Sequence, residues 1–267
     1  EQLGRLLGLN RVKIKMSQII NKMQDLQNHL EAIDSIASIK RSTSDLDDLF
    51  GYKADDVEVK KELEVDSNGK IEALLEGFQI YVSSDFVKKD NIKLISTPNE
   101  INNFLKASLI FQDHRLYPLL GEYASRLIQN SYQVGCNDFY IDLTKHEIEF
   151  FGRKLIGESD RPLNLYVNGN LGVSFGISCE YVNVAVGGNC EPSPFNRAKN
   201  STLAIDGDLS GSFIGSCSHN LNIFVSGKIS GGPALTAMSL SIKYGLDAKR
   251  HPTYISMMQE LDRRMKG

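Results

Sequence analysis

Long hydrophobic runs are absent from the sequence, and cysteines are few. No apolar stretch in the 267 residues approaches the roughly 18 residues that a membrane-spanning helix needs, so we expect no membrane span. Cys136, Cys179, Cys190 and Cys217 are the only cysteines, and no two have the C-x-x-C spacing of zinc or thioredoxin-like sites. We therefore predict free thiols, neither metal nor cofactor, and a reducing, cytoplasmic location. The chain begins with Glu1 and not with methionine, so we expect an upstream segment to have been removed or left out.

Positive charge is not in excess, and charge of either sign is scarce in one region. The net charge of −3 argues against a nucleic-acid partner, whose binding protein is usually basic. Residues 163–232 hold only seven charged residues, about a tenth of that region, against 24% for the whole chain. Because interface cores are depleted of charge, we hypothesise that at least one face of this region is covered by a partner, a second copy or the chain's own termini. The alternative is a neutral surface of Asn, Ser and Gly that stays in water.

The same region repeats a short phrase four times. The phrases are LNLYVNGNLG (163–172), VNVAVGGNC (182–190), STLAIDGDLSG (201–211) and LNIFVSGKISG (221–231). They align on four glycines at nearly constant spacing: Gly169, Gly188, Gly207 and Gly227. Before each glycine, apolar and mostly polar or small residues alternate with period 2, which is typical of a strand with one buried face. We expect each strand to end at its glycine, where a tight turn tolerates a positive φ.

A fixed period of about 20 residues with one strand per unit predicts a solenoid, because stacked coils bury an apolar face that a single coil cannot bury. Residues 148–152 are expected to form an additional, imperfect coil, which gives about four to five coils in total. The small residues Cys179, Ala198, Cys217 and Ala237 stand ten residues after the reference glycines. We predict that they line a tight interior corner.

Two segments of the repeat resemble a known family. GNLGVSFGISCEYVNVAVGG (169–188) and GDLSGSFIGSCSHNLNIFVSG (207–227) are similar to the glycine-spaced right-handed β-helix at the C-terminus of the glutamate synthase large subunit. The same fold occurs in one of the subunits of formylmethanofuran dehydrogenase. The resemblance covers about residues 148–232 and implies a right-handed parallel β-helix with a structural and interface role. The coil of residues 188–206 departs from the pattern, because EPSPFNRAKN replaces its glycines, and we expect a protruding loop there.

An a/d heptad pattern occupies residues 1–40. Its apolar positions alternate in spacings of four and three: Val12, Met16, Ile19, Met23, Leu26, Leu30 and Ile33. This seam predicts a coiled coil, either between copies or with another helix of the same chain.

Residues 41–134 are expected to form a small α+β segment. In ELEVDSNGKIEALL, Asn68-Gly69 lies between two alternating runs and favours a β-hairpin. A calcium-binding loop is the weaker interpretation, because its twelfth position would be Leu75 and not an acidic residue.

Two helices are predicted before the repeat. Thr97 supplies a capping hydroxyl, Pro98 suits a first turn and Glu100 completes a capping box, so a helix begins here and reaches about residue 112. A second helix spans about residues 117–132. We expect the pair to cover the N-terminal end of the solenoid, because exposed strand edges invite pairing.

After the repeat we predict a small-residue helix from Pro233 to Tyr244 and another from Pro252 to Met265. The second would present one apolar face to the solenoid or to a partner: Ile255, Met258, Leu261 and Met265. The fold prediction is therefore α+β, a right-handed parallel β-helix with helical caps. Its four parts are a coiled-coil helix (1–40), the α+β segment (41–134), the β-helix (135–232) and a helical tail (233–267).

Three functions fit these patterns. The first is a non-catalytic scaffold or assembly protein that binds a protein partner or itself, oligomeric through its N-terminal helix. The second is a β-helix enzyme acting on carbohydrate or acyl groups; Asp206 and Asp208, which flank Gly207, are its best candidate acids, and His219 is the only histidine in the repeat. The third is a polymerising solenoid of the bactofilin kind, against which helical caps at both ends would argue.

Overall fold

The computed structural model describes residues 70–82, 94–109, 116–144, 147–211, 214–231 and 237–266. Contacts divide the chain into two compact units, Glu1–Asp85 and Phe86–Gly267. The predicted coiled-coil seam of residues 12–33 lies outside the described residues.

In the first unit, residues 70–82 form a helix with one buried face. The buried apolar residues recur at helical spacings of three and four: Ile71, Leu74, Leu75, Phe78 and Tyr81. The predicted hairpin is wrong on its C-terminal side, because this segment is a helix and not a second strand. The helical period of the apolar residues outweighs the local turn signal of Asn-Gly.

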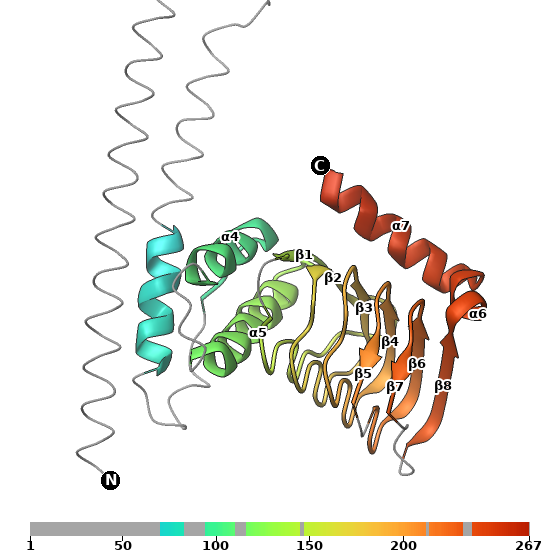
Figure 1. Ribbon diagram of the computed structural model, residues 1–267. Helices are drawn as coiled ribbons and strands as arrows, with labels where there is room; N and C mark the ends of the chain where they lie inside the picture. The colour runs from blue at the N-terminus through green and yellow to red at the C-terminus, as the bar shows by residue number, and fades with distance from the viewer. Residues whose placement is uncertain are drawn as a thin grey trace, which may run out of the picture. The chain divides into compact units, whose positions relative to one another are not determined.

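The second unit contains a parallel β-solenoid of about four turns. Its main sheet has the strand order β1-β2-β3-β4-β6-β8, with every neighbouring pair parallel (Figure 1). The six strands are β1 (Asp138–Leu143), β2 (Leu163–Gly169), β3 (Val182–Val186), β4 (Lys199–Ile205), β6 (His219–Val225) and β8 (Met238–Tyr244). A smaller sheet pairs β5 (Leu209–Ser210) with β7 (Ile229–Ser230).

The strand register confirms the repeat. Leu165 pairs with Val184, Val184 with Leu203, and Leu203 with Ile223, so each coil follows the last at the spacing of the reference glycines. All four side chains are fully buried, and each stabilises the fold by about 1.5–3 kcal/mol through its removal from water. The alternation of apolar and polar residues therefore selects the face of each strand that points inward.

The first strand of the solenoid does not lie where the repeat pattern predicts it. β1 pairs with β2 from Asp138 opposite Asn164 to Leu143 opposite Gly169, a longer step along the chain than any between the later coils. Residues 149–154 form turns, and Phe150 has a φ of 55°. The expected coil at residues 148–152 is therefore wrong as a strand, because this segment belongs to the connection between β1 and β2.

The coil of residues 188–206 has no protruding loop, contrary to the prediction. Phe195 is fully buried, and its ring centroid lies 5.6 Å from that of Phe175. Phe175 in turn lies 6.1 Å from Phe151. This row of tilted rings holds the coil in line with its neighbours, because an aromatic side chain fills the space that small residues would leave.

The interior corner contains Cys179 and Ala198 but not Cys217, which is exposed. Lys199 pairs with His219, so this coil carries one extra residue and brings Ser218 inward instead. The four cysteines all lie within the described residues and form no disulfide with one another.

The N-terminal end of the solenoid is capped by two helices, as predicted (Figure 1). They are α4 (Pro98–Leu109) and α5 (Tyr117–Gln133). At the start of α4, the Thr97 backbone N–H donates to a Glu100 carboxylate oxygen at 2.8 Å, and the Glu100 N–H donates to the Thr97 hydroxyl at 3.3 Å. This reciprocal pair is the predicted capping box.

Side chains of the cap satisfy backbone groups of the first coil. Asn102 of α4 accepts a hydrogen bond from the Asp142 N–H at 2.9 Å. Gln129 of α5 accepts from the Ile156 N–H at 2.7 Å and donates to the Ile156 carbonyl at 3.0 Å. Helix α4 therefore covers the edge of β1 and gives its backbone a hydrogen-bond partner, and α5 does the same for the connection at Ile156.

The segment after the repeat is partly a strand. The predicted helix up to Tyr244 is wrong, because Leu240, Ile242 and Tyr244 alternate with polar residues and pair with β6 as β8. The chain continues through α6 (Gly245–Lys249) into α7 (Pro252–Lys266), which confirms the helix start at Pro252.

Helix α7 packs on the outer face of the solenoid, against β2, β3 and β4 (Figure 1). Tyr254 and Leu261 are its buried residues, whereas Ile255 and Met265 are 38% and 48% exposed. Of the predicted apolar face, Leu261 is buried and Met258 packs against the cluster around Tyr254, so docking on the solenoid is confirmed for part of that face. The expected helical cap at the C-terminal end is wrong for α7, because this helix lies on the outer face of β2, β3 and β4.

The reference glycines are needed chiefly for close packing between coils. Only Gly169 has a positive φ, 120°, so the expectation of positive φ is wrong for Gly188, Gly207 and Gly227. A Cβ added to any of these three would lie 2.6 Å from the carbonyl oxygen of the reference glycine one coil earlier. Glycine is thus required because backbone stacks on backbone at this corner.

Two adjacent glycines test this explanation. We expect Gly188→Ala to lower the free energy of unfolding by about 1–3 kcal/mol, because its Cβ overlaps the neighbouring coil. Gly187→Ala is the matched control: its Cβ would meet no atom closer than 3.5 Å, so we expect a change near zero or a slight stabilisation. Urea unfolding measures both values, and equal losses at the two positions would contradict the packing explanation.

Candidate functional site

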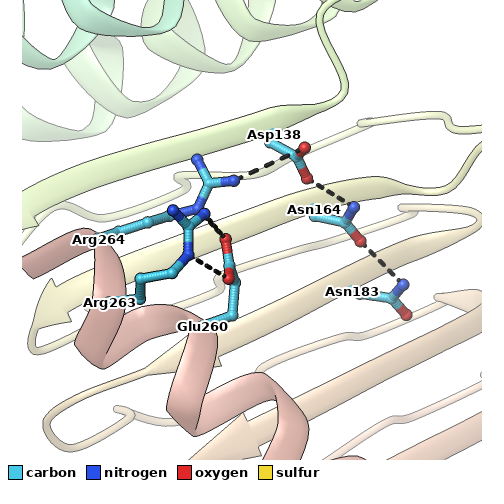
Figure 2. A network of polar contacts seen from close by, with 6 residues as sticks. All are labelled: Asp138, Asn164, Asn183, Glu260, Arg263 and Arg264. Atoms are coloured by element: carbon cyan, nitrogen blue, oxygen red, sulfur yellow. Dashed lines mark hydrogen bonds and ion pairs between the residues drawn. The ribbon is translucent and has the colours of Figure 1, made fainter. Parts of the chain in front are cut away.

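The outer face beneath α7 carries a ladder of polar side chains on neighbouring strands. Asn164 donates to an Asp138 carboxylate oxygen at 2.8 Å, and Asn183 donates to the Asn164 side-chain oxygen at 3.0 Å (Figure 2). The three residues occupy one register column of β1, β2 and β3. The repeat therefore produces a row of neutral amides that ends at a carboxylate.

The C-terminal end of α7 places an arginine over this ladder. Arg264 donates to a Glu260 carboxylate oxygen at 2.7 Å and forms an ion pair with Asp138 at 3.6 Å (Figure 2). Its guanidinium also lies 4.6 Å from the ring centroid of Tyr166, within the range of a cation–π interaction. Arg264 thus fastens α7 to both β1 and β2.

Glu260 and Tyr166 have shifted pKa values for different reasons. Hydrogen bonds from Arg263 and Arg264 lower the pKa of Glu260 to about 2. Burial raises the pKa of Tyr166 to about 12. Around neutral pH both groups keep one charge state, Glu260 ionised and Tyr166 neutral.

The N-terminal end of α7 is held by a second contact. The Tyr254 hydroxyl donates to an Asp206 carboxylate oxygen at 2.8 Å, and burial raises the pKa of Tyr254 to about 12. Its ring packs with Ala204, Phe224 and Ala248. A small apolar cluster and one hydrogen bond therefore fix this end of the helix.

The two candidate acids of the repeat serve structural contacts. Asp206 accepts from the Tyr254 hydroxyl and also from the Ser226 hydroxyl, at 3.2 Å in the second case. An Asp208 carboxylate oxygen accepts from the Lys228 backbone N–H at 2.7 Å. In the preceding coil the side-chain oxygen of Asn189 accepts a hydrogen bond from the Asp208 N–H at 2.8 Å. Asp208 therefore belongs to a ladder of hydrogen bonds that links successive coils.

A groove of about 660 Å³ lies between α7 and the sheet. It is lined by Asn164, Tyr166 and Asn183 of the strands and by residues of α7 between Thr253 and Arg263. Glu260 is its only acid, and a carboxylate with a pKa near 2 is a weak base. Among the described residues there is no group of three or more His, Cys, Asp or Glu side chains that could hold a metal ion.

The other distinctive surface is the end of the solenoid at β8. Met238, Tyr244 and Leu246 are 69%, 66% and 65% exposed, the three most exposed large hydrophobic residues of the described part of the chain. β8 is the last strand of the sheet within that part. An exposed apolar strand at a sheet edge is a site for strand addition.

The structure does not bring the residues predicted from the sequence together into one site. The glycines form a packing column and the cysteines are separate. The α7 contacts and the β8 edge were both missed. The signal for β8 in the sequence was the alternation of Leu240, Ile242 and Tyr244 with polar residues. It was not recognised because β8 has no glycine aligned with the reference glycines.

Comparisons with known proteins add no relative: no family model, curated protein or solved structure matches the chain. Among the described helices, none is both long and apolar enough to cross a lipid bilayer.

The arginine contacts predict a pH dependence of stability. The folded pKa of Glu260, about 2, is below the ordinary value of 4.5, so its stabilising contribution is complete above about pH 5 and is lost as the pH falls toward 2. We expect the difference in thermal midpoint between the wild type and Glu260→Gln to shrink across this range. Gln259→Ala, a neighbouring change without a titrating group, should differ from the wild type by a constant amount. A wild-type advantage over Glu260→Gln that persists at pH 2 would contradict the assignment.

Proposed function

We propose that this protein is a non-catalytic assembly protein whose solenoid presents a surface for protein–protein interaction. The observation that carries the proposal is the difference between the two ends of the solenoid. Helices α4 and α5 cover the β1 end, whereas β8 leaves apolar residues exposed at the other end. A solvated end would be expected to carry polar residues, as the capping units of solenoids do.

The low charge of residues 163–232 supports the same function. Helix α7 covers the outer face over β2, β3 and β4, so part of the low charge is explained by the chain's own C-terminus. The end at β8 lies beyond residues 163–232, carries the exposed hydrophobic residues Met238 and Tyr244, and has no described strand paired with its outer edge. This end is the one we assign to a partner.

The finer family assignment belongs to this proposal. We take the solenoid to be right-handed and similar to the β-helix of the glutamate synthase large subunit, in which that domain has a structural and interface role. The same interpretation includes a cytoplasmic location, consistent with four cysteines that form no disulfide.

Both alternatives have less support from the contacts. An enzyme acting on carbohydrate or acyl groups would need available acids, but Asp206 and Asp208 accept hydrogen bonds from neighbouring elements. A solenoid that polymerises through both ends would need the β1 edge, and α4 packs against it.

The N-terminal seam provides the first test. The 267-residue chain should have a light-scattering mass near twice 29.7 kDa or a higher multiple, and removal of residues 1–40 should lower it or abolish partner binding. Ile19→Asp with Leu26→Asp should have the same effect, because both changes place charge on the predicted seam.

The matched control is Gln18→Asp with Gln27→Asp, which adds the same charge beside the seam and should leave the mass unchanged. An assembly role for residues 1–40 would be contradicted if the 267-residue chain is a monomer and its deletion variant binds the same partners.

A further inference from the structure

Among the described strands, β8 is the last of the sheet, and no described coil covers the three interior columns that end at it. On one side Leu240, Ile242 and Tyr244 pair with β6 residues that are at most 1% exposed. On the other side no described residue pairs with them, and Tyr244 is 66% exposed. The backbone N–H and C=O groups along the free edge of a strand can also form hydrogen bonds with a further strand.

We propose that β8 pairs in an antiparallel manner with β8 of a second copy, so that two solenoids join at their open ends. The proposal rests on the assembly function above and names the partner of this surface. The joined sheet would run without a break from β1 of one copy to β1 of the other. The interior columns would be continuous across the joint.

The sequence of β8 is self-complementary in this arrangement. Ser239 has a φ of 56° and interrupts the strand, so the regular part is residues 240–244. With Ile242 opposite itself, Leu240 faces Tyr244 of the second copy on the inner side. On the outer side Lys243, the only charged residue of β8, faces Ser241 and not another lysine. Like charges directly opposite would be destabilising.

The opposite end of the molecule excludes the main competing arrangement. Head-to-tail stacking would need a free β1 edge, but Asn102 accepts from the Asp142 N–H and Lys106 forms an ion pair with Asp142 at 2.9 Å. Of the two ends of the described solenoid, β8 is the one left for joining, so the contact is between identical surfaces and closes after two copies.

The experiment places charge on β8: Tyr244 lies in an inner column, and Met238 lies in the exposed column of Lys199 and His219. Met238→Lys with Tyr244→Lys changes two residues that are already exposed, so each solenoid should remain folded. In a joint the lysine at position 244 would be buried in an inner column, and the lysine at position 238 would add charge at the end of the paired strands; charge on an edge strand is one way in which natural proteins prevent pairing. We expect the light-scattering mass of the 267-residue chain to fall by at least half, and the apparent dissociation constant of the joint to rise at least tenfold.

The matched control changes two hydrophobic residues of similar exposure away from β8. Val134→Lys with Ile156→Lys alters side chains that are 55% and 53% exposed and lie beside the N-terminal cap. We expect the wild-type mass. Far-ultraviolet circular dichroism of both double variants checks that the solenoid is intact.

A cross-linking measurement keeps the test decisive if the lysine variant does not fold. A photoreactive phenylalanine replaces Tyr244 in full-length protein, and isotopically heavy and light chains are mixed. We expect heavy–light cross-links between two β8 peptides. Cross-links confined to one chain, or made to residues 1–69, would overturn the proposal.

The outcomes for the two proposals can be told apart. A mass that falls after deletion of residues 1–40 but not after the lysine changes would reject the β8 joint and leave the assembly function standing. A mass that falls only after the lysine changes would support the joint without the N-terminal seam. A monomer at every concentration would reject both the joint and self-assembly.

Discussion

The structure depends on the close stacking of backbone on backbone between coils. Neighbouring strands of a sheet lie about 4.8 Å apart, and at the reference corner this distance leaves no room for a Cβ. Gly188, Gly207 and Gly227 each face the carbonyl oxygen of the preceding glycine. The ladder of Asn170, Asn189 and Asp208 accepts backbone N–H groups one coil later. One geometric requirement thus accounts for the glycine, for the polar residue that follows it and for the nearly constant length of the coils.

The interior of the solenoid could be predicted from the sequence because each coil needs the same residue types at the same positions as its neighbour: alternating apolar residues and a glycine at the corner. β2, β3, β4 and β6 all end near a reference glycine, and their alternation is clear. β1 and β8 could not be found in this way, since a longer connection joins β1 to β2 and β8 has no aligned glycine. An end strand has a neighbouring coil on one side only, so the residue pattern of the central coils is weaker in the first and last strands.

The contacts of α7 were beyond sequence reasoning for a different reason. Tyr254 meets Asp206 across 48 residues, and Arg264 meets Asp138 across a longer interval. Such pairs depend on the path that α7 takes over the sheet, which no local pattern encodes. Tyr254 is buried in place of Ile255, and the helical spacing of Ile255, Met258, Leu261 and Met265 did not distinguish the two. The residues that hold α7 are therefore visible only in the folded chain.

The turn after β8 determines what the C-terminal end of the solenoid exposes. Gly245 has a φ of 58° and no atom within 4 Å of the place where a Cβ would be, so it allows the chain to reverse direction without a packing requirement. Helix α6 then contacts β6 and β8, and α7 follows the outer face of β2, β3 and β4, where Tyr254 and Leu261 are buried. No described strand pairs with the far edge of β8. At the other end, Asn102 and Gln129 reach the backbone of the first coil and substitute for a missing neighbour. The residues of the repeat do not themselves terminate the sheet, so the flanking segments determine the surface at each end. Hydrogen-bonding side chains meet the backbone at the β1 end, and β8 presents exposed hydrophobic residues at the other.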